Sequence, residues 1–128
     1  MPSDSPRLRE LEDRQRQLAR QILDLGFVQQ GTVVHRPTRC QTPGCRCHAD
    51  PPLLHGPYWQ LTRYAAGRTK TRRLTEREAS LYREWIANRR HLDALVAEME
   101  KVGDEAARLL LERSEPDRRL RKARKPTT

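Results

Sequence analysis

Apolar residues in the first part of the chain recur every three or four positions, which places them on one face of an α-helix. The helix is expected to begin near Ser5, with Pro6 in its first turn, and Gly26 is typical of the position where a helix stops. Residues 1–26 are therefore predicted to form an amphipathic helix. The positions on its packing face are Leu8, Leu11, Gln15, Leu18, Ile22 and Leu25.

The middle of the chain changes to a pattern that is typical of β-strands. Residues 58–64 and 68–74 are two strand-like runs joined by a turn that contains Gly67, which predicts a β-hairpin. Residues 27–36 are rich in β-branched side chains and predict a further strand. We expect residues 27–74 to form a small antiparallel sheet.

A second helix is predicted over residues 75–112. Thr75 and Glu78 form a capping box, in which each side chain satisfies a backbone N–H of the other residue. Arg89 interrupts the apolar face, and residues 113–128 are expected to be a disordered basic tail. The periodic apolar residues of the helix are Tyr82, Trp85, Leu92, Val96 and Met99.

Helices at both ends with strands between them predict an α+β fold. We expect the N-terminal helix and the long C-terminal helix to pack on the small antiparallel β-sheet. The side chains expected at this interface are Trp59, Leu61 and Leu74 on the strands and Tyr82, Trp85 and Ile86 on the long helix.

Residues 37–57 follow none of these patterns. They contain five of the nine prolines and no apolar periodicity, and a long irregular loop needs something other than a core to hold it. The same stretch contains all three cysteines, Cys40, Cys45 and Cys47. Zinc prefers thiolate and imidazole ligands and takes four of them tetrahedrally in structural sites. The sequence therefore predicts a Cys-rich loop that is stapled by one structural zinc ion.

Two histidines compete for the fourth ligand position. His48 is adjacent to Cys47, so both side chains have to turn toward one ion from neighbouring positions. His55 follows a Pro-Pro loop at the mouth of a strand, which gives it easier geometry. We favour His55 and keep His48 as the alternative. Reduced cysteines in a mobile loop, a redox role and another metal are the competing interpretations.

Composition and charge limit the function. The chain has 128 residues, of which 35% are hydrophobic and 34% charged, so a large core is excluded. No apolar run approaches the roughly 20 residues that a membrane span needs, and no signal peptide is evident, so we expect a cytoplasmic protein. The net charge of +9 is concentrated in residues 32–90 and 113–128, whereas residues 91–112 are acidic. A localised positive charge favours a polyanionic partner, with DNA as the first candidate.

An enzyme is not expected. Four protein ligands would leave no open position on the metal, so a catalytic ion is disfavoured. The sequence also has no Gly-rich phosphate loop, serine nucleophile elbow or paired acidic active site.

Several motifs between residues 26 and 100 are shared with a known group of proteins. They are Gly31-Thr32-Val33, the cluster Cys40…Cys45-Arg46-Cys47-His48, the run His55-Gly56-Pro57-Tyr58-Trp59, and Gly67-Arg68. In these motifs the chain resembles a family of short uncharacterised bacterial proteins, a domain of unknown function that is often encoded near transposases and integrases. The family has Gly-Lys where this chain has Gly67-Arg68. The resemblance implies a cysteine-rich site and a mobile-element context, and it implies no established activity.

These observations lead to the hypothesis of a zinc-stabilised DNA-binding accessory protein of mobile elements. A basic β-ribbon can lie in the major groove, and the basic tail would add non-specific attraction. The arrangement of residues 59–86 is also similar to the arm-type DNA-binding domains of tyrosine recombinases. The residues expected to contact DNA are Arg36, Arg39, Arg46, Arg63, Arg68, Lys70, Arg72 and Arg73.

An alternative hypothesis is a non-enzymatic protein-interaction adaptor whose basic charge is incidental. Its helices could pair within the chain or across a coiled-coil homodimer. The zinc loop would then be a platform for a recombinase or transposase partner. A zinc- or redox-responsive regulator is a third hypothesis, which rests on the thiols alone.

Overall fold

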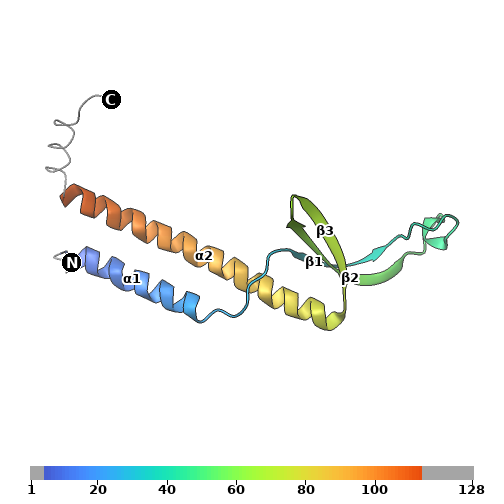
Figure 1. Cartoon of the computed structure of the whole chain (residues 1–128), viewed down its shortest axis with the longest axis horizontal. Helices are drawn as coiled ribbons and strands as arrows, with labels where there is room; N and C mark the ends of the chain where they lie inside the picture. Colours follow the sequence, from blue (N-terminus) through green and yellow to red (C-terminus); the bar gives the residue numbers. More distant parts are fainter. Residues whose placement is uncertain (1–4, 114–128) are drawn as a thin grey trace, which may run out of the picture. The chain divides into compact units, whose positions relative to one another are not determined.

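The computed structural model describes residues 5–113 of the chain (Figure 1). Two α-helices and a three-stranded antiparallel sheet confirm the expected α+β class. The predicted basic tail lies almost wholly outside the described residues. The elements are α1 (Pro6–Leu23), β1 (Thr32–Thr38), the short 3₁₀ helix η1 (Arg46–His48), β2 (His55–Ala65), β3 (Arg68–Leu74) and α2 (Glu76–Arg113).

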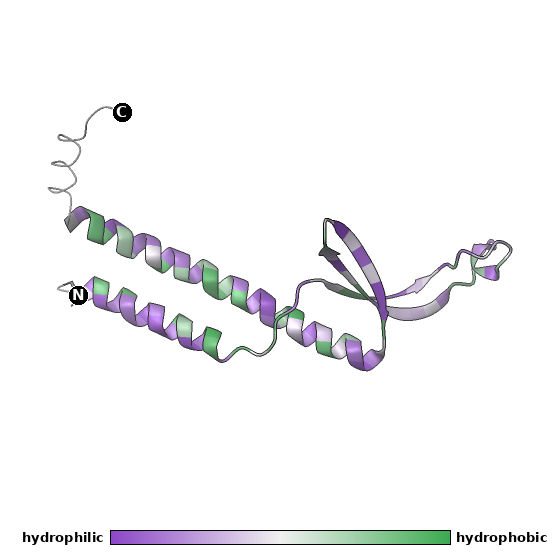
Figure 2. Ribbon diagram, viewed as in Figure 1, coloured by the Kyte–Doolittle hydropathy of each residue, from purple (hydrophilic) through white to green (hydrophobic). Residues whose placement is uncertain are grey.

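Contacts within the chain divide it into two compact units. The first unit combines α1 with the part of α2 that begins at Leu92, and we call it the helical unit. The second unit is Gly26–His91, which contains the sheet, the cysteine loop and the first part of α2, and we call it the sheet unit. Figure 2 shows that hydrophobic positions recur along both helices, whereas β3 is hydrophilic over most of its length. No helix within residues 5–113 is both long enough and apolar enough to cross a membrane.

The helical unit follows the apolar pattern of the sequence except at Val96, which is exposed while its neighbour Leu95 is buried. Ser5 caps α1, and its side chain accepts a hydrogen bond from the backbone N–H of Leu8 at 3.5 Å, with Pro6 at the start of the helix. Arg7 donates to Glu105 of α2 at 2.8 Å. Ion pairs of exposed side chains contribute little to stability, so the unit is held mainly by its apolar positions. The buried side chains of this unit are Leu8, Leu11, Leu18 and Leu95.

The first part of α2 starts with the predicted capping box. The backbone N–H of Glu78 donates to Thr75 Oγ1 at 3.1 Å, and the backbone N–H of Thr75 donates to Glu78 Oε1 at 2.9 Å. The hydrogen bond from the Thr75 N–H lowers the pKa of Glu78, because it favours the carboxylate. Thr75 and Glu78 both belong to the sheet unit, where the capping box fixes the start of α2 directly after β3.

The sheet has the order β1-β2-β3 and packs one face on α2. β2 pairs with both neighbours, so that Leu61 lies opposite Val33 of β1 and opposite Arg72 of β3. Ala66 and Gly67 have positive φ values of 52° and 78°, which is the two-residue turn that a twisted hairpin favours. The core of the unit is Leu61, Leu74, Ala79 and Ile86, with Val33, Trp59 and Tyr82 packed against it.

The first strand differs from the prediction of residues 27–36, because β1 begins only at Thr32. The preceding segment is bonded to the helix instead of the sheet. The backbone N–H of Gln29 donates to the carbonyl oxygen of Trp85 at 3.1 Å, and Asn88 donates to the carbonyl oxygen of Phe27 at 2.8 Å. Trp85 accordingly contacts the edge of the Phe27 ring, at a centroid distance of 6.4 Å.

Candidate metal centre

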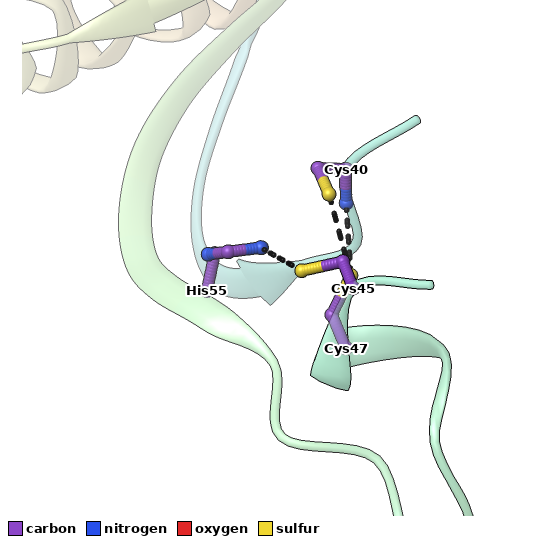
Figure 3. Close-up of side chains that lie close together, drawn as sticks. All are labelled: Cys40, Cys45, Cys47 and His55. Carbon is purple, nitrogen blue, oxygen red and sulfur yellow. Dashed lines mark hydrogen bonds between the residues drawn. The ribbon is translucent and has the colours of Figure 1, made fainter. Parts of the chain in front are cut away.

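Four potential ligands converge from three segments of the sheet unit (Figure 3). Cys40 follows β1, and His55 is the first residue of β2. Cys45 directly precedes η1, and Cys47 is the middle residue of η1. Their sulfur and nitrogen atoms all lie within 4.8 Å of one another. The group can hold a metal ion, and it consists of the three cysteines and the histidine that the sequence favoured.

Two of the distances inside the group are close to those expected for tetrahedral coordination. Sulfur and nitrogen ligands of a tetrahedral zinc ion lie about 2.0–2.3 Å from the metal, which puts them about 3.5–3.8 Å from each other. The Sγ atoms of Cys40 and Cys47 are 3.5 Å apart, and Cys45 Sγ is 3.4 Å from His55 Nε2. These two pairs are therefore already spaced as neighbouring ligands of one ion.

Local backbone hydrogen bonds fold the cysteine loop. The N–H of Cys45 donates to the carbonyl oxygen of Thr42 at 3.3 Å, in a turn where Gly44 has a φ of 79°. The N–H of His48 then donates to the carbonyl oxygen of Cys45 at 2.9 Å and closes η1. This turn and the short helix bring Cys45 and Cys47 back toward the strand ends. Cys47 is fully buried, although the loop has no apolar core around it.

Hydrogen bonds and burial act on the thiols in opposite directions. A hydrogen bond from the backbone of Thr42 lowers the pKa of Cys40 to about 6, and bonds with Cys47 and His55 act in the same direction. Burial raises the pKa of Cys47. The backbone N–H of Cys40 also donates to the Cys47 sulfur at 3.4 Å, a contact that favours a thiolate at that position.

His48 does not join the cluster. Its Nε2 lies 2.7 Å from the carbonyl oxygen of Cys40, where it serves as a donor to the backbone. The His48 ring therefore holds the backbone at Cys40 and does not serve as a fourth metal ligand. His55 reaches the three cysteines because it pairs with Thr38 across β1 and β2. This pairing places the backbone of His55 beside the end of the strand that leads to Cys40.

The basic residues that the sequence predicts to contact DNA lie on different surfaces. Residues directly opposite each other on neighbouring strands share a face, so the register divides the sheet cations into two sets. Arg63, Arg68, Lys70 and Arg72 lie on the face that carries Leu61 and Leu74, while Arg36 and Arg73 lie on the opposite face. Arg39 and Arg46 belong to the cysteine loop.

The residues Cys40, Cys45, Cys47 and His55 are called the metal cluster below. A hollow of about 200 Å³ adjoins this cluster and is lined by two of the predicted DNA-contacting arginines. The guanidinium of Arg73 lies 3.7 Å from the centre of the Tyr58 ring within it. Sequence reasoning did not single out Thr38 or Tyr58, although strand alternation puts Tyr58 on the face of Arg73. The hollow is lined by Thr38, Arg39, Cys40, His55, Tyr58 and Arg73.

A larger hollow of about 450 Å³ lies on the helix-facing side of the hairpin. Its walls combine the apolar side chains Leu61, Ala65 and Tyr82 with cations. One of these cations, Arg72, pairs with Glu78 at 3.5 Å.

The chain matches one known protein family over a stretch that includes this site. A family model described as a domain of unknown function (DUF6788) matches residues 8–84. The chain belongs to this family. The match includes most of α1, the whole sheet and all four candidate ligands of the DUF6788 chain, which confirms that the chain belongs to a family of unknown function. Searches of curated proteins and of solved structures found no match.

Proposed function

We propose that this protein is a zinc-stabilised, DNA-binding accessory protein that acts with mobile elements. Three thiolates and one imidazole favour zinc over the hard cations, which prefer oxygen ligands. Four protein ligands complete a tetrahedral site, so the ion has a structural role and the protein is non-enzymatic. The same proposal places the protein in the cytoplasm, where thiols remain reduced and available to metal.

The observation that carries the DNA-binding role is the unbalanced charge of the sheet unit. Residues 32–74 contain eight basic side chains and one acidic side chain, Asp50. Within the described part of the chain, Arg72 is the only one of these eight cations that pairs with a carboxylate. All residues of β3 before Leu74 are exposed. Such a surface attracts the phosphates of a nucleic acid, and binding releases the counterions of that polyanion.

The mobile-element context comes from the resemblance of the cysteine cluster and the His55-Gly56-Pro57-Tyr58 run to proteins encoded near transposases and integrases. A recombinase or transposase is accordingly the protein partner in this proposal. DNA is the common substrate of these enzymes, so an accessory protein with a basic surface would act on the same molecule.

A salt titration of DNA affinity tests the proposal. Fluorescence anisotropy with a labelled duplex should give a plot of log affinity against log salt with a slope of roughly −4 to −5, as expected for about five neutralised phosphates. Elemental analysis of the purified protein should give one zinc ion per chain. Absence of binding, or a slope near zero, would contradict the DNA-binding role, and a metal-free folded protein would contradict the structural zinc.

One observation favours the adaptor as a second candidate. Leu53 and Leu54, between the ligands Cys47 and His55, are 60% and 42% exposed. Apolar side chains at the tip of a rigid loop are typical of contacts with another protein. Light scattering should then show a homodimer that the double substitution Leu53→Ser and Leu54→Ser converts to a monomer. An identical monomeric mass for both proteins would remove homodimerisation from this candidate.

A further inference from the structure

We infer that a phosphate-binding site lies beside the metal cluster, in the 200 Å³ hollow on the sheet face opposite α2. Arg39, Arg73, Tyr58 and Thr38 are its donors, and we call this set the phosphate pocket. Its ligand is a phosphate group, supplied either by the backbone of DNA or by a free phosphate ion. With DNA as the source, the inference rests on the proposed function and names the place where the backbone is held.

The donor chemistry of the pocket matches a phosphate group. Each guanidinium offers several N–H donors in a planar fork, which suits paired oxygens of a phosphate. Thr38 and Tyr58 also line the hollow, and each has a hydroxyl group that can donate a hydrogen bond. Asp50 is the only acidic residue between positions 26 and 75, and it does not line the hollow. The pocket thus presents donors and positive charge with no competing carboxylate in its lining.

Arg73 is held in place before any ligand arrives. Its guanidinium lies over the Tyr58 ring at 3.7 Å, a contact in which the ring attracts the cation without using its N–H donors. Those donors stay available at the edge of the guanidinium. A side chain that is already positioned loses less conformational entropy on binding, so the contact increases affinity for an anion.

Arg72, the neighbouring residue, has a different environment. Strand alternation turns it toward α2, where it pairs with Glu78 at 3.5 Å and approaches the Tyr82 ring at 5.9 Å. The hollow on that side also includes Leu61 and Ala65 in its walls. An apolar wall cannot replace the hydration of a phosphate. The two adjacent arginines therefore differ in function although they have the same charge.

The phosphate pocket shares two of its walls with the metal cluster. Cys40 and His55 line the hollow and are candidate metal ligands. Arg39 directly precedes Cys40, and Thr38 pairs with His55 in the register of β1 and β2. An ion bound to Cys40 and His55 would therefore fix the strand ends that carry these two donors. Phosphate affinity is expected to depend on the bound metal.

The test compares Arg73→Gln with Arg72→Gln in the full-length, metal-loaded protein. Both variants lose one positive charge at adjacent positions, so a difference between them reports on the site and not on net charge. Affinity for a labelled duplex is measured by anisotropy, and binding of inorganic phosphate is followed by NMR shifts of Tyr58 and its neighbours. Zinc content and circular dichroism check that both variants are folded.

Arg73→Gln should weaken DNA binding about tenfold or more, as expected for a lost charge-assisted hydrogen bond, and should abolish the phosphate shifts at Tyr58. Arg72→Gln should weaken DNA binding less than about threefold, which corresponds to one exposed charge, and should keep the phosphate shifts. Removal of the metal with a chelator should also abolish the phosphate shifts.

The other outcomes separate the two proposals. Equal losses for both variants would overturn the phosphate pocket while DNA binding stands. Phosphate shifts that Arg73→Gln abolishes, in a protein with no affinity for DNA, would overturn the proposed function and leave free phosphate as the ligand. Failure of both probes to bind the wild-type protein would overturn both proposals. Full phosphate affinity in the metal-free protein would contradict the dependence on metal.

Discussion

α1 and the loop of residues 37–57 are similar in length, but different interactions hold them. α1 has 18 residues and buries three leucines on one face. Residues 37–57 bury Cys47 alone, and that side chain points into the metal cluster. The helix therefore gains its stability from apolar surface, whereas the loop, in our proposal, depends on a metal ion held by four ligand atoms.

This comparison shows how a small, highly charged chain can keep a long irregular segment ordered. Burial of one leucine contributes about 1.5–3 kcal/mol, and several such residues are needed to hold a helix. A structural zinc ion, as we propose for this site, contributes roughly 10–16 kcal/mol in apparent terms. With such an ion bound, the loop would need few apolar residues, and its remaining positions could carry arginines.

The largest expected effect is loss of the metal site. Cys45→Ser or His55→Ala should release the ion and open residues 37–57, because the loop has no other core. Hydrogen exchange of the loop amides should become fast, while the amides of α1 remain protected. His48→Ala is the matched control and should retain the metal, since its ring bonds to the Cys40 carbonyl oxygen. Metal loss in His48→Ala, with retention in His55→Ala, would reverse the ligand assignment.

The converse experiment truncates the apolar face of α1. Leu18 is 1% exposed, so Leu18→Ala should destabilise the helical unit by about 2–5 kcal/mol through lost burial and an internal cavity. Denaturant unfolding followed by circular dichroism measures the change. Zinc content and exchange of the loop amides should stay at wild-type values. Release of the metal by Leu18→Ala would show that the two regions are stabilised together.

Substitution of two glycines by alanine should change the stability of the protein in opposite directions. Gly31, next to β1, has a φ of +140°, and a Cβ there would lie 2.9 Å from Leu61 Cδ1 and 3.0 Å from the Thr62 carbonyl oxygen. Gly31→Ala should therefore destabilise the sheet unit by about 1–3 kcal/mol. Gly103 lies within α2 and has open space around it, so Gly103→Ala should stabilise the helical unit by about 0.5–1 kcal/mol. Thermal unfolding of both variants measures whether each substitution lowers or raises the stability.

The smallest expected effect is the response to acid. The pKa of Glu78 in the sheet unit and the pKa of Glu105 in the helical unit are both lowered from 4.5. The Thr75 N–H is the main cause for Glu78, and Arg7 is the main cause for Glu105. Each carboxylate adds stability that is complete above pH 4.5 and disappears as the pH falls through its lowered pKa.

NMR titration of the two carboxyl groups measures these pKa values directly. Thr75→Ala keeps the backbone N–H and removes only the hydroxyl group of Thr75, so the pKa of Glu78 should rise slightly and remain below 4.5, while that of Glu105 should not change. Arg7→Ala removes the main cause at the other site, so the pKa of Glu105 should return toward 4.5 and that of Glu78 should not change. A change at both sites from either substitution would show that the two regions are coupled.

The sequence alone determined the features that depend on neighbouring residues. Ser5 and Pro6 at the start of α1, the capping box at Thr75 and the hairpin turn at Gly67 could all be predicted, because local backbone geometry demands these residue types. The candidate metal ligands could be predicted for a related reason. Three cysteines within eight positions of an irregular loop have no role in a core, so their chemistry stands out.

Only the tertiary structure decided what distant segments do together. The segment before Thr32 bonds to α2, which no local pattern indicates. Pairing of Thr38 with His55 brings that histidine to the cysteines, while His48 turns to the backbone. Packing of Leu74 on α2 places Arg72 on the sheet face toward that helix and leaves Arg73 beside Tyr58 on the opposite face. The positions of these residues depend on which face of the sheet packs on α2 and on which strands pair. Contacts between residues far apart in the chain determine both.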